Sequence, residues 1–349
     1  MQLIDSLDAG GAERVAVTFA NALSSEIDGS YLCVTRSEGV LKEQLFNEVQ
    51  FSFIRKKSTL DLRAVWRLRA YLKLHKIELI HAHTTSYFMA TLVKLAYPKI
   101  KLIWHTHLGS RVLTSRWQNK VLYLCSLFFA SIITVNEDLK LWCVRKLIPS
   151  KVFYLPNFVS FSDAEEITVR EPSIICLANL KNPKNHLNLI RAFEKIHIKF
   201  PSWKLLLAGK DFLDSYSEKL NESTKQAGLQ NKVVFLGQQR DVASLLDKSA
   251  IGVLASDSEG LPMSLLEYGA AGLAVVVTKV GHCEEVVAGF GQVVMPNDAD
   301  ALAQGLESYM MNDQKRRTDA SNFREHILKH YSEKTILPQL INIYKKNTY

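Results

Sequence analysis

Short apolar segments rich in β-branched and aromatic residues alternate with longer amphipathic stretches along this chain of 349 residues. Segments that are apolar on both faces are typical of strands buried in a parallel sheet, and the amphipathic stretches between them fit crossover helices. The alternation therefore predicts an α/β fold with parallel sheets. The predicted strands are residues 2–5, 31–36, 51–54, 78–83, 102–107, 131–135, 152–156, 174–180, 204–209, 233–237, 251–256, 273–279 and 292–296.

A polar, acidic stretch separates two series of these strands. Residues 161–173, FSDAEEITVREPS, have no hydrophobic period and are predicted to form a linker. We expect two doubly wound, Rossmann-like domains, residues 1–162 and 163–330, whose sheets present their carboxyl ends to a shared cleft. Residues 331–349 are predicted to form a helical tail that packs back on the first domain. A fold of this kind does not by itself determine a function.

Cysteine usage and hydropathy indicate the cellular setting. The five cysteines are scattered without a C-x-x-C pair, which is typical of buried thiols in a reducing compartment. No basic segment followed by an apolar run opens the chain. The longest apolar stretch, residues 121–135, is shorter than the roughly 18–20 residues that span a bilayer. We therefore expect a cytoplasmic protein without a transmembrane helix.

The net charge of +8 is unevenly distributed. Residues 1–170 carry 22 Lys and Arg against 15 Asp and Glu, whereas residues 171–349 carry 21 against 20. A basic half suits an anionic partner such as a membrane surface, although a solvated basic face is equally compatible with the charge alone. No nucleic-acid-binding motif is visible, so no nucleic-acid partner is predicted. The first strand is not followed by G-x-G-x-x-G, which argues against a dinucleotide dehydrogenase.

The most informative local pattern is SDSEGLPMSLLEYGAAG, which follows an apolar strand. Pro262 stands where the first turn of a helix is expected, because its fixed φ and missing N–H suit that position. Ser256, Asp257 and Ser258 are the candidate caps of this helix. The free N–H groups at such a helix start form a ready site for a diphosphate.

Two glutamates flank the start of this predicted helix. Glu259 precedes the helix and Glu267 lies inside it. Carboxylates accept hydrogen bonds from the vicinal hydroxyls of a ribose or a hexose. On their own, the two residues are better explained as an acid near the positive end of the helix dipole and an ordinary surface glutamate.

The segment resembles the E-X7-E region of the retaining glycosyltransferases of family 4, which have the GT-B fold. The resemblance covers nearly the whole chain and is densest over residues 174–290. It implies transfer of a hexose or N-acetylhexosamine from a nucleotide sugar, most commonly UDP-linked in this family, to a lipid-linked or oligosaccharide acceptor in capsule, exopolysaccharide or lipopolysaccharide assembly. The other matching segments are GGAER, LANLKNPKNHLNLIRAF, LLLAGKD, VVFLGQQRDVASLL and VGHCEEVV.

The resemblance also implies roles for single residues. Lys184 neutralises the donor diphosphate, Glu259 contacts the donor sugar near the reacting carbon, and His107 contacts the same sugar. Glu267 holds the ribose hydroxyls, and no metal or cofactor is implied because Lys184 and helix N–H groups supply the positive charge. Further donor-binding candidates are Gly10, Gly11, Asn179, Gly209, Gly260, Leu261, Pro262 and Ser264. The acceptor-side candidates are His83 and Arg111.

The histidines form two H-x-H pairs at predicted strand ends, His81 with His83 and His105 with His107. Residues at i and i+2 of a strand share one face, so each pair can act together. Sugar contact is the favoured interpretation, satisfied strand-end histidines come second, and a metal site comes last because no Cys or acidic cluster accompanies the pairs.

The chain departs from the family pattern at two places. Asn179 stands where the family often has Arg, so the second cation on the diphosphate has to come from elsewhere, with Lys181 as the candidate. The late Gly-Gly of the family is Gly281-His282 here.

Membrane association is predicted from residues 111–130, which combine basic and aromatic residues with an apolar helix. We expect a buried helix whose first turn, together with the Lys/Arg-rich residues 55–76, contacts an anionic membrane at its cytoplasmic face. The alternatives to a transferase are a GT-B nucleotide-sugar epimerase and a non-catalytic GT-B scaffold. Retention of both glutamates and of Lys184 argues against the scaffold.

Overall fold

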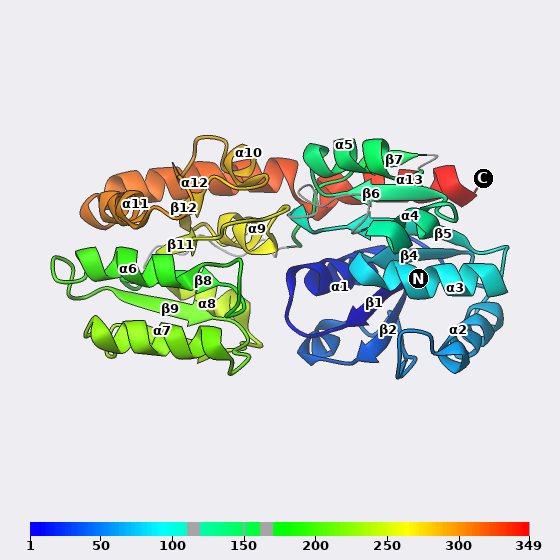
Figure 1. The fold of residues 1–349 in the computed structure, drawn as a ribbon. Helices are drawn as coiled ribbons and strands as arrows, with labels where there is room; N and C mark the ends of the chain where they lie inside the picture. The colour runs from blue at the N-terminus through cyan, green and yellow to red at the C-terminus, as the bar shows by residue number, and fades with distance from the viewer. Residues whose placement is uncertain (110–118, 149–150, 161–169, 349) are drawn as a thin grey trace. The chain divides into compact units, whose positions relative to one another are not determined.

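The structure is a computed structural model that describes residues 1–109, 119–148, 151–160 and 170–348. The chain divides into two compact units (Figure 1). The first unit consists of Met1–Ser160 together with Glu333–Tyr349, and the second consists of Phe161–Ser332. The C-terminal tail thus belongs to the first unit, although 172 residues of the second unit separate it from Ser160 in the sequence.

The first unit is built on a seven-stranded parallel sheet in the order β3-β2-β1-β4-β5-β6-β7. Its helices cover both faces of the sheet, α2 to α5 on one side and α1 with α13 on the other. The strands are β1 Gln2–Ser6, β2 Tyr31–Ser37, β3 Gln50–Phe53, β4 Leu79–His83, β5 Lys101–Thr106, β6 Ser131–Thr134 and β7 Val152–Tyr154. The α-helices are α1 Gly11–Leu23, α2 Leu62–Leu74, α3 Tyr87–Ala96, α4 Lys120–Ser126, α5 Glu137–Lys146 and α13 Glu333–Thr348.

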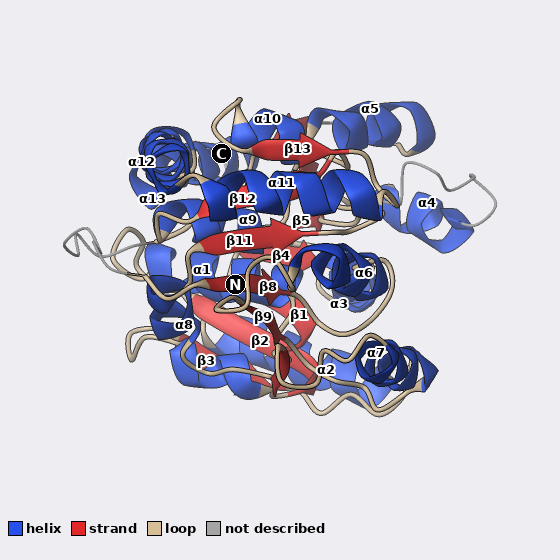
Figure 2. Ribbon diagram, turned by 90° about the vertical axis from the view of Figure 1, so that its left-hand side faces the viewer, coloured by secondary structure: helices blue, strands red, loops and turns tan. Residues whose placement is uncertain are grey.

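The second unit has a six-stranded parallel sheet in the order β10-β9-β8-β11-β12-β13. Helices α6, α7 and α11 pack side by side on one face, and α9 packs with α12 on the other (Figure 2). The strands are β8 Ser173–Leu177, β9 Lys204–Ala208, β10 Val233–Gly237, β11 Ile251–Leu254, β12 Ala274–Thr278 and β13 Gln292–Val294. The helices are α6 His186–Ile196, α7 Ser215–Gln226, α8 Val242–Lys248, α9 Met263–Ala270, α10 Cys283–Val287, α11 Ala299–Met311 and α12 Asp313–His330.

Each predicted strand segment overlaps a strand of the structure. The central strands are buried along their whole length, as β4 and β12 show, because helices cover both faces of each sheet. Several helices start at an Asp or Asn whose side chain accepts a hydrogen bond from a backbone N–H of the first turn. These caps are Asp61, Asn136, Asn185, Asp214, Asp241, Asp298 and Asn312.

The order of strands reverses direction at one place in each sheet. The chain moves outward from β1 through β2 and β3 and then returns to β4, and it does the same from β8 through β10 to β11. Loops at the carboxyl ends of the two strands that flank such a switch point are the usual ligand-binding positions of open α/β sheets. The predicted Gly10, Gly11 and His83 lie at this edge of the first sheet, and Lys184 and Glu259 lie at the same edge of the second.

The five cysteines are free and buried, as predicted. Within the described residues, no helix combines the length and the apolar character that crossing a bilayer would require.

Candidate active site

Two loops of the second unit are joined at the switch point between β8 and β11. The backbone N–H of Asp257 donates to the carbonyl oxygen of Pro183 at 2.8 Å. The side chain of Asn185, in the left-handed conformation with φ of 50°, donates to a carboxylate oxygen of Asp257 at 2.7 Å and also caps α6. Asparagine adopts this conformation more readily than most residues, which explains its place at the bend.

Lys184 and Glu259 form an ion pair between these loops. The Lys184 Nζ lies 2.6 Å from the Glu259 Oε1, although the two residues are 75 positions apart in the sequence. The Ser256 hydroxyl donates to the same carboxylate oxygen at 2.6 Å. The side chain of Glu259 is 9% exposed and that of Lys184 is 23% exposed. The structure thus brings together the two residues to which sequence analysis gave the central roles.

Helix α9 begins later than the predicted cap residues. Pro262 is the cap residue itself, in an extended conformation, and no side chain caps the helix. The prediction that Ser256, Asp257 or Ser258 caps this helix is wrong, because Ser256 is used to hold Glu259 and Asp257 to hold the neighbouring loop. The N–H groups of the first turn, which includes Ser264, therefore have no side-chain cap and suit an anion.

Helix α9 also carries Glu267, and its Tyr268 anchors the helix to β8 and β11. The hydroxyl of Tyr268 accepts a hydrogen bond from the backbone N–H of Leu177 at the end of β8, at 2.7 Å. The Tyr268 ring packs so closely on β11 that a Cβ added at Gly252 would lie 2.5 Å from it. The half-buried Glu267 is thus held on a helix that is fixed against the two strands of the switch point.

The loop after β11 also requires a glycine in the neighbouring loop. Gly281 has φ of +52°, and a Cβ added there would lie 2.2 Å from the carbonyl oxygen of Glu259. The next residue, His282, donates its backbone N–H to the carbonyl oxygen of Gly260 at 3.1 Å. Gly281-His282 therefore supports the backbone on which Glu259 is mounted, and Leu261 is buried beside it.

Asn179 supports a loop rather than supplying charge. Its side-chain oxygen accepts a hydrogen bond from the backbone N–H of Lys210 at 2.9 Å. Gly209 precedes that lysine, and a Cβ there would lie 2.1 Å from a carbonyl oxygen of the adjoining loop. The ammonium groups of Lys210 and Lys181 lie 5.5 and 5.6 Å from the centre of the Phe212 ring. Two cations are therefore gathered near the residue that replaces the family's arginine.

In the first unit, the glycine pair begins α1. Gly10 is the cap residue in an extended conformation, and Gly11 opens the helix. A Cβ added at Gly11 would meet no atom within 4 Å. A Cβ at Gly10 would instead meet the Glu13 carboxylate, so the open space through which a ligand can approach the backbone lies at Gly11.

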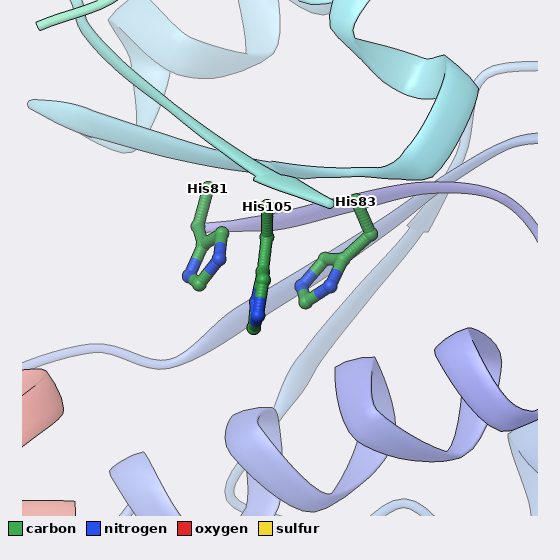
Figure 3. Close-up of side chains that lie close together, drawn as sticks. All are labelled: His81, His83 and His105. Atoms are coloured by element: carbon green, nitrogen blue, oxygen red, sulfur yellow. The ribbon is translucent and has the colours of Figure 1, made fainter. Parts of the chain in front are cut away.

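The four paired histidines lie together, and three of them contact Phe19 of α1. His81 and His83 lie on β4, His105 lies on β5, and His107 follows β5. The ring centroids of His81 and His83 are 4.5 Å apart with planes at 12°, and those of His83 and His107 are 5.3 Å apart at 15°. Figure 3 shows the rings of His81, His83 and His105 side by side on one face of the sheet. The shared face predicted from the H-x-H spacing is confirmed.

Burial keeps these histidines neutral. Loss of solvation lowers the pKa of His81, His83 and His105 well below 6.5, and it lowers the pKa of His107 to about 3. Ring nitrogens of three of them lie within 4.8 Å of one another. The ring planes of His81, His83 and His105 lie 12° to 37° apart, which sets the rings beside one another, whereas a zinc ion needs the lone pairs of its ligands to converge on one point. The arrangement favours a stack of neutral rings.

Arg111 and the other residues between 110 and 118 lie outside the described residues.

Two family models match this chain over adjoining ranges. The family described as Glycosyltransferase Family 4 matches residues 9–163, and the family described as Glycosyl transferases group 1 matches residues 160–326. The chain belongs to glycosyltransferase family 4. Its two parallel-sheet units are the Rossmann-like domains of the GT-B fold.

One relative of this glycosyltransferase is named for O-antigen biosynthesis. The chain is 25% identical to the O-antigen biosynthesis glycosyltransferase WbnH of Escherichia coli, over 98% of this chain and 97% of that protein. It is 24% identical to the Escherichia coli UDP-Gal:alpha-D-GlcNAc-diphosphoundecaprenol alpha-1,3-galactosyltransferase, over 85% and 84% of the two chains. The structure of Anabaena HepE in complex with UDP-glucose is similar in fold, with a TM-score of 0.81, 18% identity and coverage of 99% and 100%.

The apolar helix α4 of this glycosyltransferase is only half buried, so the prediction of a buried helix is wrong. Val121, Leu124 and Leu127 are between 52% and 59% exposed. The end of α5 is tied to the end of α4, because the Ser126 hydroxyl accepts the backbone N–H of Ile148 at 3.1 Å. Leu122 and Cys125 of α4 join the core, and α5 adds the further exposed apolar side chains Leu141 and Val144.

Several residues that contact the predicted ones were not predicted from the sequence. The side chains of Gln2 and Tyr344 bond to the stacked histidines, and Phe19 of α1 packs against them. Gln2 was foreseeable in part, since β1 lies beside β4 and Gln2 pairs with His81. Tyr344 carried no signal, because its position depends on where the C-terminal helix docks.

Proposed function

We propose that this glycosyltransferase moves a hexose or N-acetylhexosamine from a UDP-sugar to a lipid-linked saccharide, with retention of configuration and without a metal ion. The observation that carries the proposal is the contact of Lys184 with Glu259 close to the uncapped start of α9. A cation, a carboxylate and free helix N–H groups at one switch point suit a sugar diphosphate, which offers both negative charge and hydroxyl groups.

Lys184 would exchange partners when the donor binds. In the free protein its ammonium group is held by Glu259. A diphosphate near the start of α9 would draw the ammonium away and leave the carboxylate to accept hydrogen bonds from the sugar hydroxyls. Lys184 and the helix N–H groups would then stabilise the charge that grows on the diphosphate as the sugar leaves.

The reaction breaks the bond between the anomeric carbon and the diphosphate oxygen and forms a bond from that carbon to the acceptor oxygen. With retention, the acceptor approaches on the face that the diphosphate leaves, so the departing phosphate oxygen can take the acceptor proton. No enzyme nucleophile is assigned. Glu267 would hold the ribose hydroxyls of the nucleotide, and His107 with the Gly10-Gly11 turn of the first unit would contact the donor sugar.

A diphosphoundecaprenol-linked acceptor is supported by the relative that acts on one, and O-antigen assembly by the relative named for it. A lipid-linked acceptor requires the enzyme to work at a membrane. The exposed apolar side chains of α4 are accompanied by basic residues, among them Lys120, and this combination suits an anionic lipid surface. We therefore propose peripheral association with the cytoplasmic face of the plasma membrane.

The first test is calorimetric binding of UDP, GDP, ADP and dTDP to the wild type and to Glu267→Ala. Selective binding of UDP that the variant loses is expected. Binding of none of them would contradict the donor site and favour a scaffold. The matching UDP-sugars are then assayed with a synthetic diphosphoprenyl saccharide, with and without EDTA, and the anomeric configuration of the product is read by NMR. A changed sugar without any acceptor would indicate an epimerase instead.

A further inference from the structure

A chain of hydrogen bonds links the C-terminal helix to His107. The Nδ1 of His81 lies 2.6 Å from the hydroxyl of Tyr344, and the side-chain nitrogen of Gln2 donates to the same hydroxyl at 2.9 Å. The side-chain oxygen of Gln2 lies 2.9 Å from Nε2 of His83. The Nδ1 of His83 lies 3.1 Å from Nε2 of His107. The chain thus runs from His81 on β4 to His107 by way of α13 and β1.

The amide of Gln2 gives this chain a direction. Its oxygen can only accept, so His83 must carry a proton on Nε2 and donate it to Gln2. A neutral histidine has one N–H and one lone pair, so the Nδ1 of His83 is then an acceptor. The proton between His83 and His107 must therefore belong to Nε2 of His107.

Tyr344 holds the amide in that orientation. Its hydroxyl lies 2.6 Å from Nδ1 of His81, which is shorter than the usual N–H···O distance and within the range of a hydroxyl donor, so we assign the hydroxyl proton to His81 and leave the hydroxyl oxygen to accept from the nitrogen of Gln2. If the amide of Gln2 turned over, its oxygen would face Tyr344 and every donor along the chain would reverse. The two directions differ in the location of the proton on His107, Nε2 in one and Nδ1 in the other.

We propose that Tyr344 and Gln2 are positioning residues that fix His107 as the tautomer protonated on Nε2. The Nδ1 of His107 is then a hydrogen-bond acceptor, and within the described residues no group bonds to it. This nitrogen is buried, so a hydroxyl or an amide N–H of the substrate reaches it only when the residues that cover it move aside, and a carboxylate, which has no proton to donate, is disfavoured there. This consequence rests on the proposed function, which places the donor sugar at His107, whereas the tautomer itself does not.

The burial of the whole chain supports a fixed direction. His81, His83 and the side chain of Gln2 are almost completely inaccessible to solvent. The histidines stay neutral at physiological pH because burial lowers their pKa values. A neutral histidine that cannot exchange partners with water keeps the tautomer that its neighbours dictate.

The test is the tautomer of His107, measured by long-range 1H–15N NMR on the full-length protein labelled with 15N-histidine, without donor or acceptor. In the wild type, His83 and His107 are both expected to be protonated on Nε2. A His107 protonated on Nδ1 would overturn the proposal, and this measurement needs no destabilising variant.

The variant Tyr344→Phe removes the hydroxyl that orients the amide of Gln2. Its spectrum is expected to show His83 and His107 distributed over both tautomers. The matched control is Ile343→Val, which shortens a buried side chain of the same helix without touching the hydrogen-bond chain, and it should keep the wild-type tautomers. Unchanged tautomers in Tyr344→Phe would refute the role of Tyr344.

The activity of the same variants separates this inference from the proposed function. Equal populations of the two tautomers in Tyr344→Phe are expected to raise the KM for the donor about twofold while leaving the control unaffected, because only the fraction protonated on Nε2 offers the acceptor. A changed tautomer with unchanged donor kinetics would place the sugar away from His107 and contradict the proposed function, while the hydrogen-bond chain would stand.

Discussion

The ion pair between Lys184 and Glu259 makes different predictions for stability and for turnover. Two unit charges about 4 Å apart attract by about 4 kcal/mol at an effective dielectric of 20, and desolvation offsets much of this. Exposed pairs contribute at most about 1 kcal/mol, whereas removing one partner of a buried pair costs about 3–5 kcal/mol. This pair lies between these limits, with side chains 23% and 9% exposed.

We therefore expect Lys184→Ala to lower the free energy of unfolding of the second unit by about 2 kcal/mol, since it leaves a largely buried carboxylate without its cation. For a domain of this size, that loss lowers Tm by about 4–8 °C. Adding Glu259→Gln removes the unpaired charge and should restore more than half of the loss, because the Ser256 hydroxyl can still donate to the amide oxygen.

Turnover should not recover with stability. Loss of the Lys184 cation is expected to lower the rate of sugar transfer by about 10²–10³-fold, which is the usual effect of removing one preorganised group that stabilises transition-state charge. The double variant should be at least as slow. Thermal unfolding and donor–acceptor assays on the wild type, Lys184→Ala, Glu259→Gln and the double variant measure stability and turnover. The exposed pair of Lys195 and Asp300 is the control, and Lys195→Ala should change neither quantity by much.

Two results would refute this reasoning. If the double variant is no more stable than Lys184→Ala, the two charges do not interact in the folded protein. If the double variant regains turnover, Lys184 acts only by neutralising Glu259 and does not bind the diphosphate.

Three further predictions follow from other parts of the structure. Gly281→Ala should lower turnover and Tm more than Gly228→Ala, because both glycines have positive φ but only a Cβ at Gly281 would clash with the backbone of Glu259. Equal losses of turnover and Tm in the two variants, measured by assay and thermal unfolding, would contradict this. Below pH 6.5, each buried histidine of the stack should cost about 1.4 kcal/mol of unfolding free energy per pH unit, since its depressed pKa favours proton uptake by the unfolded chain. That stability is complete above pH 6.5 and falls as the pH approaches the folded-state pKa. Denaturant titrations at several pH values should show that His105→Leu makes the dependence of unfolding free energy on pH shallower by one proton. Leu124→Glu should reduce sedimentation with phosphatidylglycerol vesicles several-fold at unchanged Tm, and binding equal to that of the wild type would exclude α4 from the membrane contact.

The sequence by itself determined the secondary structure of this protein. The strands were predictable because parallel strands buried on both faces require uninterrupted apolar segments, and β12 with its sequence AVVVT is an example. The E-X7-E segment also placed Glu259 in a loop and Glu267 inside a helix, since the distance between them along the chain follows from the helix itself. Chemistry that depends on residues close together in the sequence was thus predictable from the sequence alone.

Contacts between distant segments were decided only by the tertiary structure. Nothing local indicated that the Lys184 ammonium group would lie 2.6 Å from the Glu259 carboxylate, because the two residues are 75 positions apart in the sequence. Tyr344 reaches the histidines only because the last helix returns to the first unit, across the whole of the second unit in sequence. Apolar helix α4 remains half exposed because burial depends on which surfaces the fold provides, and composition alone does not contain that information.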